Sequence, residues 1–172
     1  ATTLAEQLGP IRFHELLNDF FRDIAEAALE CEAEIHKYVG DEAILTWSSK
    51  DALASGDCLR CPFVAHDLMA ARSKAYLARF GRVPGFRAAL HVGEIVAGEI
   101  GDVRREIAYV GDTLNVAARL LEAAKEVGHD VLVSADLLDR VPLPQALVAE
   151  KLPTLTVRGR AAPLGIAALR PA

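Results

Sequence analysis

The sequence predicts an α+β domain in which an antiparallel sheet is backed by helices. Three observations lead to this class. Apolar residues recur at helical spacing in three long stretches, extended runs rich in β-formers lie between them, and Gly or Pro separates most segments. The chain has 172 residues, 52% hydrophobic and 25% charged, a globular balance that fits one domain. Disordered and low-complexity chains are therefore excluded.

The first part of the chain predicts a helix followed by a hairpin. Over residues 11–29 the apolar positions repeat every three or four residues, which predicts an amphipathic helix. Two extended runs, 34–39 and 42–47, flank Gly40 and Asp41. We therefore expect a β-hairpin with Gly40 and Asp41 at its tip.

A second helix and a group of strands are expected next. Residues 48–56 are polar and predict a turn, whereas residues 57–80 predict a long helix that ends at Gly81. Pro62 either kinks this helix or marks its first turn. Three extended pieces follow at 86–92, 94–100 and 106–110.

The last part of the chain predicts a third helix and several short strands. Residues 111–126 have a helical pattern, 131–133 predict a buried strand, and Ser134 is expected to cap a short helix. Strand-like pieces of the tail lie at 146–150, 154–157 and 166–169.

One further strand before residue 1 would complete a βαββαβ order, the ferredoxin-like arrangement. The chain also begins without Met and in a helix-like run. We therefore expect residues 1–172 to be a single domain that is incomplete at its N-terminus.

Charge and cysteine content limit the partners and the compartment. The net charge of −5 argues against a general nucleic-acid binder. No apolar run is long enough to cross a bilayer, and the first residues do not form a signal peptide. The three cysteines lack a disulfide framework and fit a reducing compartment, so we expect a cytoplasmic domain without membrane contact of its own. Cys58 and Cys61 are interpreted as helix-packing residues rather than metal ligands.

The predicted hairpin carries the first candidate site residues. Asp41 at the tip can ligate Mg²⁺, which prefers oxygen ligands, although Gly-Asp turns without function are common. Lys37, four residues earlier, is on its own equally a solvated strand lysine.

Two later segments carry an amide and several cations. Asn115 and Arg119 are four residues apart and share one face of the predicted helix, where they can hold a ribose oxygen and a phosphate. Arg158 and Arg160 flank Gly159 and can bind a polyphosphate. A solvated helix face and two solvated arginines are the alternatives.

Together these segments resemble the catalytic domain of class III nucleotidyl cyclases, the family of adenylyl and guanylyl cyclases, and most of all its bacterial members. The resemblance covers residues from about 4 to 169 of this chain. It depends on three motifs in matching order and separation, with HVGEIVAGEIG before the second: Lys37-x-x-Gly40-Asp41, Gly111-Asp112-Thr113-Leu114-Asn115-Val116-Ala117-Ala118-Arg119 and Val157-Arg158-Gly159.

The resemblance implies a signalling enzyme, a lyase that converts a nucleoside triphosphate to its 3′,5′-cyclic monophosphate and pyrophosphate. Two divalent ions per site, Mg²⁺ or Mn²⁺, would assist the attack of the 3′-hydroxyl on the α-phosphorus. Asp41 matches the second metal aspartate, and Lys37 matches the base-reading residue, which is lysine in adenylyl cyclases and typically glutamate in guanylyl cyclases. Asn115 matches the ribose-orienting residue and Arg119 the one that stabilises the pentavalent phosphorus.

The remaining implied contacts are to phosphate and to the partner subunit. Arg158 falls where the family has a phosphate-binding lysine, with Arg160 as the alternative if the alignment slips by two residues, and Gly40 belongs to the substrate-binding motif. The family's sites form between two subunits, so the resemblance implies a homodimer that binds ATP. Sensory or membrane segments are expected upstream in the parent protein.

Two positions depart from the family pattern. Ala108 stands where the family has Asp, Thr or Ser in contact with the base; alanine offers no side-chain hydrogen bond, so we expect looser discrimination of the base than Lys37 alone implies. The first metal aspartate would lie before residue 1, so we expect little or no cyclase activity from this chain and activity from a longer parent. A catalytically impaired, nucleotide-binding regulatory domain and a guanylyl cyclase are the alternative functions.

Overall fold

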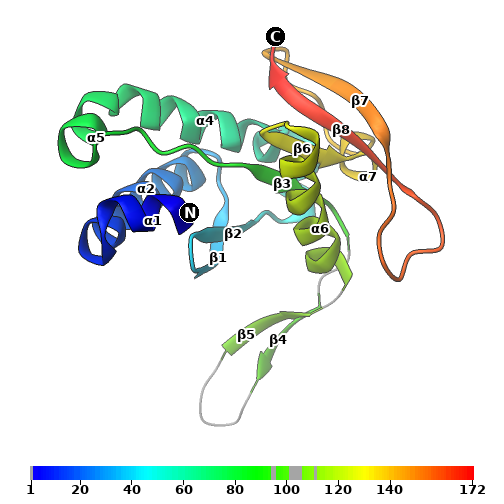
Figure 1. Cartoon of the computed structure of the whole chain (residues 1–172). Coiled ribbons are helices and arrows are strands. Elements are labelled where there is room, and N and C mark those ends of the chain that lie inside the picture. The colour runs from blue at the N-terminus through cyan, green and yellow to red at the C-terminus, as the bar shows by residue number, and fades with distance from the viewer. Residues whose placement is uncertain (1, 94–95, 101–105, 111) are drawn as a thin grey trace. The chain divides into compact units, whose positions relative to one another are not determined.

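The computed structural model describes residues 2–93, 96–100, 106–110 and 112–172 (Figure 1). The chain divides into two compact units, Ala1–Phe86 and Arg87–Ala172. The helices are α1 (Thr2–Leu8), α2 (Pro10–Glu30), α3 (Ser49–Ser55), α4 (Asp57–Ala71), α5 (Ser73–Phe80), α6 (Asp112–Val127) and α7 (Ala135–Leu138). The strands are β1 (Glu34–Val39), β2 (Glu42–Thr46), β3 (Ala88–Leu90), β4 (Val96–Ile100), β5 (Glu106–Val110), β6 (Val131–Ser134), β7 (Leu147–Leu155) and β8 (Leu164–Pro171).

The first unit is built on α2, which packs against α4 (Figure 1). The predicted amphipathic helix is confirmed: Leu16, Phe20 and Ile24 are buried at intervals of four. Burying an aliphatic or aromatic side chain of this size stabilises the fold by about 1.5–3 kcal/mol. The core of this unit also contains Met69 from α4 and Phe80 from α5.

The predicted hairpin is confirmed as β1 and β2, which pair antiparallel around a two-residue turn. The register shifts between Ile35 and Lys37, so His36 is the extra residue of a β-bulge. The indole N–H of Trp47, just after β2, donates a 2.9 Å hydrogen bond to the carbonyl of Cys31 at the end of α2. This bond ties the hairpin to the helix that precedes it.

Two expectations for the following segment are wrong. Residues 48–56 contain the helix α3 rather than a turn, because Lys, Ala and Leu in this stretch favour a helix and Ala52 is buried. The expected helix over 57–80 is two helices, since the backbone departs from helical geometry at Arg72 (φ −100°, ψ 16°). Pro62 lies inside α4, and Gly81 ends α5 at φ +77° as expected.

The second unit contains a four-stranded sheet in the order β3-β6-β8-β7. The sheet is mixed rather than wholly antiparallel, because β3 and β6 run parallel while β8 is antiparallel to β6 and β7. The strands β4 and β5 form a separate antiparallel pair. The predicted α+β class is confirmed, and the helix α6 packs on β3 and β6 (Figure 1).

The predicted strand boundaries in this unit need two corrections. The strand expected over 86–92 is only three residues long, β3. The pieces expected at 146–150 and 154–157 are not separate strands, because β7 runs continuously through Pro153. Its register with β8 is irregular between Leu152 and Leu155, and β7 is an edge strand, the position where a sheet tolerates a proline.

Candidate active site

The β1–β2 hairpin positions the first group of predicted site residues. At the turn, the φ of +59° at Gly40 is a conformation that favours glycine. Lys37 and Asp41 are both exposed. The ring of Tyr38 packs on Phe21 of α2, with 4.4 Å between centroids. Because successive strand residues point to opposite faces, Lys37 lies on the face turned away from α2.

His36, the bulged residue, has a lowered pKa. Partial burial is the larger cause, and the positive charge of the neighbouring Lys37 adds to it. Between the lowered pKa of the folded chain and the ordinary value of 6.5, the unfolded chain therefore binds more protons at His36 than the folded chain does. Because protons bind preferentially to the unfolded chain, lowering the pH through this range favours unfolding.

Replacing Lys37 with glutamate is expected to raise the pKa of His36, because it exchanges a repelling charge for an attracting one. The measurement is an NMR titration of the His36 ring, with Lys74→Glu on α5 as the matched control. An unchanged His36 titration in Lys37→Glu would contradict the assigned cause.

The helix α6 carries Asn115 and Arg119 on one face, as predicted. Asn115 is exposed, and the Arg119 side chain is 32% exposed. The Nη1 atom of Arg119 lies 3.7 Å from a carboxylate oxygen of Glu126 and 4.0 Å from one of Glu122. Neither distance is a hydrogen bond, and this buried Nη1 has no hydrogen-bond partner in the described part of the chain. Arg119 is therefore held in ion pairs with these two carboxylates, and its buried Nη1 lacks only a hydrogen bond.

The segment after β7 distinguishes Arg158 from Arg160. Arg160 lies 3.7 Å from a carboxylate oxygen of Asp136 and is partly buried, so it already has a partner. Arg158 is exposed, and no carboxylate within the described ranges forms an ion pair with it. The intervening Gly159 has φ +87°, and the preceding Val157 is buried in the same core cluster as the inner face of α6. Arg158 is therefore the better placed of the two cations for a phosphate.

The predicted site residues are distributed over both units. Lys37, Gly40 and Asp41 belong to the first unit. Ala108 lies in β5 of the second unit, where it pairs with Gly98. The second unit also holds Asn115, Arg119, Arg158 and Arg160. Gly111 of the second motif lies outside the described residues.

The predicted metal site contains a single candidate ligand within the described ranges. Asp41 supplies one exposed carboxylate, whose oxygens fit the preference of Mg²⁺ and Mn²⁺. No group of three His, Cys, Asp or Glu residues that could hold an ion occurs in this part of the chain. A metal at Asp41 would therefore need further oxygen ligands, which nucleotide phosphates can supply.

The three cysteines are buried free thiols in the first unit. Burial raises the pKa of Cys58 to about 11. A hydrogen bond between Cys31 and Cys61 lowers the pKa of the former and raises that of the latter. Their packing role between α2 and α4 agrees with the interpretation from sequence.

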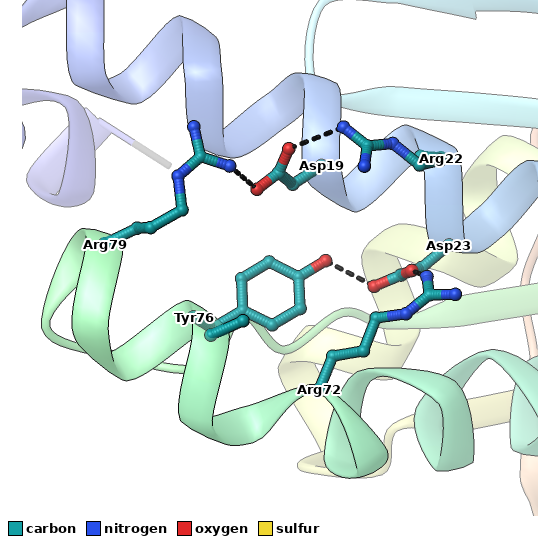
Figure 2. A pocket seen from close by; sticks show the side chains of 7 residues that line it. Asp19, Arg22, Asp23, Arg72, Tyr76 and Arg79 are labelled. Carbon is teal, nitrogen blue, oxygen red and sulfur yellow. Dashed lines mark hydrogen bonds and ion pairs between the residues drawn. The ribbon is translucent and has the colours of Figure 1, made fainter.

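A cluster of charged residues around the buried Asp23, not predicted from the sequence, joins α2 to α5 (Figure 2). It surrounds a cavity of about 150 Å³. Asp23 is only 1% exposed, and it accepts a hydrogen bond from the Tyr76 hydroxyl and forms an ion pair with Arg72. Asp19 pairs with Arg79 and with Arg22.

The cluster has a structural role, because its buried carboxylate is fully partnered. Burial and the charge of Asp19 raise the pKa of Tyr76. The burial of Asp23 could have been predicted from its position in the sequence. Asp23 follows Phe20 by three residues and precedes Ala27 by four, which places it on the apolar face of α2.

Solved structures of nucleotidyl cyclases share the fold of this chain. The adenylyl cyclase CyaB from P. aeruginosa superposes with a TM-score of 0.77 at 20% identity, covering 99% of this chain and 88% of that one. The guanylyl cyclase Cya2 gives a TM-score of 0.75 at 20% identity, covering 98% of this chain and 85% of that one. The architecture is therefore that of a class III cyclase domain.

The sequence comparisons specify the family. Residues 1–163 match the family described as the adenylate and guanylate cyclase catalytic domain. The chain belongs to this family. "Adenylate cyclase 2" of Rhizobium meliloti is 40% identical over 169 residues, which are 98% of this chain and 47% of the relative. The chain thus spans about half the length of this curated relative. Within the described ranges, no helix is long and apolar enough to span a membrane.

Proposed function

We propose that this chain is the catalytic domain of an adenylyl cyclase, which converts ATP to 3′,5′-cyclic AMP and pyrophosphate. The observation that carries the choice of ATP is Lys37, exposed on the outer face of the hairpin whose tip holds Asp41. A lysine ammonium donates hydrogen bonds and suits N1 of adenine, which accepts them, whereas guanine presents an N–H at this position. The 40% identity to an adenylate cyclase supports the same choice.

In the proposed reaction the 3′-oxygen of ATP attacks the α-phosphorus, and the bond to the departing pyrophosphate breaks. Asn115 orients the ribose, and Arg119 donates hydrogen bonds to the oxygens of the pentavalent phosphorus. The geometry of Arg119 supports this role, because its Nη1 forms only long ion pairs, at 3.7 Å with Glu126 and 4.0 Å with Glu122, which a phosphate can replace without breaking a hydrogen bond. Arg158 holds phosphate oxygens of the departing group.

Asp41 is the residue that would hold Mg²⁺ or Mn²⁺. When bound, divalent ions activate the attacking oxygen and neutralise charge on the phosphates. We propose further that two copies of the chain form a homodimer, with Lys37, Asn115 and Arg119 of one copy completing the site of the other.

The test measures cyclic AMP and cyclic GMP formed from ATP and GTP with Mn²⁺. The assay uses the chain and a version extended upstream by one strand. Asp41→Ala is expected to lower cyclic AMP formation by about a hundredfold or more, whereas the exposed Asp67→Ala on α4 is the matched control. Lys37→Glu is expected to shift the preference towards GTP. Cyclic GMP as the main product of the unaltered protein would instead support a guanylyl cyclase.

A nucleotide-binding regulatory domain is the second candidate function, and Ala108 favours it. This residue lacks a side-chain donor or acceptor for the base. A folded, dimeric, upstream-extended protein that binds ATP without forming a cyclic product would favour this candidate. Ala108→Thr would then be the first substitution to test for recovered activity.

A further inference from the structure

We propose that His91 and Gly93 are positioning residues, which fix the first turn of α6 against the sheet and so set the position of Asn115 and Arg119. The consequence for the reaction depends on the proposed function. The attachment itself does not, so it can be tested separately.

The first contact holds the segment that leaves β3, rather than α6 itself, and it lies where β3 and β6 end. It acts on α6 through Gly93, two residues further along the chain. These strands run parallel up to the pair Leu90 and Val133. The next residues, His91 and Ser134, are joined by a 2.7 Å hydrogen bond between Nδ1 and Oγ. Ser134 is fully buried, and its Oγ also accepts the backbone N–H of Leu137 at 3.3 Å.

The two bonds at Ser134 fix the orientation of the His91 ring. Oγ accepts the N–H of Leu137, and its hydroxyl can also form the bond to Nδ1 of His91. A Ser-His nucleophile pair is not a competing interpretation, since Ser134 is buried and caps α7.

The second attachment is a close approach of Gly93 to α6. A Cβ atom at Gly93 would lie 2.4 Å from Oγ1 of Thr113 and 3.2 Å from its Cγ2. Thr113 is in the first turn of α6. The absence of a side chain at Gly93 therefore lets the chain leaving β3 pack directly on the start of this helix.

The contact at Gly93 matters because it holds α6 at Thr113, before the buried anchors of the helix begin at Val116. Val116 and Leu120 bury its inner face in the core of the second unit. Asn115 and Arg119 lie on the outer face, so the pose of the first turn decides where they point. A displacement of about 1 Å at a reacting group can cost about a hundredfold in rate.

The first experiment replaces His91 with alanine and with asparagine, whose amide oxygen can accept a hydrogen bond near the Nδ1 position. His91→Ala is expected to lower kcat by about ten- to a hundredfold with a KM for ATP within about threefold. His91→Asn is expected to recover most of kcat. The exposed His14→Ala on α2 is the matched control. Equal kcat losses in both His91 variants would overturn the role assigned to the hydrogen bond.

A readout independent of activity is amide hydrogen exchange. His91→Ala is expected to accelerate exchange at residues 113–119 by about tenfold, with α2 and α4 unchanged. If the unaltered protein forms no cyclic nucleotide, the proposed function fails while this measurement still tests the attachment. Unchanged exchange at 113–119 would overturn the proposal whatever the activity.

The second experiment tests whether a substitution at Thr113 suppresses the effect of a substitution at Gly93. Gly93→Ala is expected to reduce kcat and accelerate exchange in the first turn of α6, because its Cβ collides with Oγ1 of Thr113. Adding Thr113→Ala removes Oγ1 and Cγ2 and should restore both, measured against Thr113→Ala alone. Adding Thr113→Val instead keeps two γ atoms at this position and should restore neither kcat nor the exchange rate. Failure of the alanine pair to restore exchange would contradict the close approach as the cause.

Discussion

Replacing Arg119 with alanine, in the form of the protein that makes cyclic AMP, is expected to lower kcat for this reaction by about 100- to 1000-fold while KM for ATP changes little. The reason is that Arg119 donates to oxygens whose charge develops mainly in the transition state, so its removal costs rate rather than ground-state binding. The expectation depends on the position of Arg119 one helical turn after Asn115, where long ion pairs to Glu122 and Glu126 rather than a hydrogen bond hold its Nη1.

Arg119→Lys tests whether charge alone suffices. Lysine keeps the charge but loses the planar pair of donors, so a loss of about tenfold or more is still expected. The exposed Lys125→Ala on α6 is the matched control, and circular dichroism checks that the helix is retained. An Arg119→Ala protein within about threefold of the unaltered kcat would remove Arg119 from the proposed reaction.

Replacing Asp23 with alanine is expected to lower the free energy of unfolding by about 2–3 kcal/mol, the second large effect. Removing this carboxylate leaves the buried Tyr76 hydroxyl without its acceptor, whereas Arg72, which is 41% exposed, keeps its ion pair with Glu26. Urea unfolding followed by Trp47 fluorescence measures the change, because Trp47 is the one tryptophan and lies in the first unit.

A milder variant keeps this prediction testable if the Asp23 variant does not fold. Tyr76→Phe removes only the hydroxyl that donates to Asp23 and is expected to cost about 1–2 kcal/mol. Asp67→Asn, an exposed carboxylate on α4, serves as the control and should cost under about 0.5 kcal/mol. A cost below about 1 kcal/mol for Asp23→Ala would show that the buried pair does not stabilise the fold.

The elements predicted best from sequence are those whose signal is local. The apolar repeat of α2 and the Gly40-Asp41 turn between two β-rich runs are each encoded within a few residues. The same holds for α6, whose buried positions Val116 and Leu120 are four apart.

The elements predicted wrongly depend on contacts that sequence spacing does not contain. The break between α4 and α5 falls at Arg72, whose side chain pairs with Asp23 and Glu26 from another helix. The continuity of β7 through Pro153 depends on its place at a sheet edge, which is decided by the order of strands.

The helix face shared by two of the candidate residues was predictable from sequence, but the contacts of the candidate residues were not. The spacing of Asn115 and Arg119 places them on one helix face, which the structure bears out. That Arg160 is occupied by Asp136 while Arg158 is not follows only from tertiary packing. The His91–Ser134 bond likewise joins residues 43 positions apart, brought together by parallel pairing of β3 with β6.

The placement of the cysteines allows the opening of the first unit to be measured by a chemical reaction. All three thiols are at most 4% exposed and lie in the first unit, and the second unit contains none. An alkylating reagent therefore reaches a thiol only when the first unit opens, and the labelling rate reports the free energy of that opening. Amide exchange in the cysteine-free second unit gives the free energy of opening of that unit. Equal values for the two units would show that they unfold together as one cooperative body, and different values that they unfold one after the other.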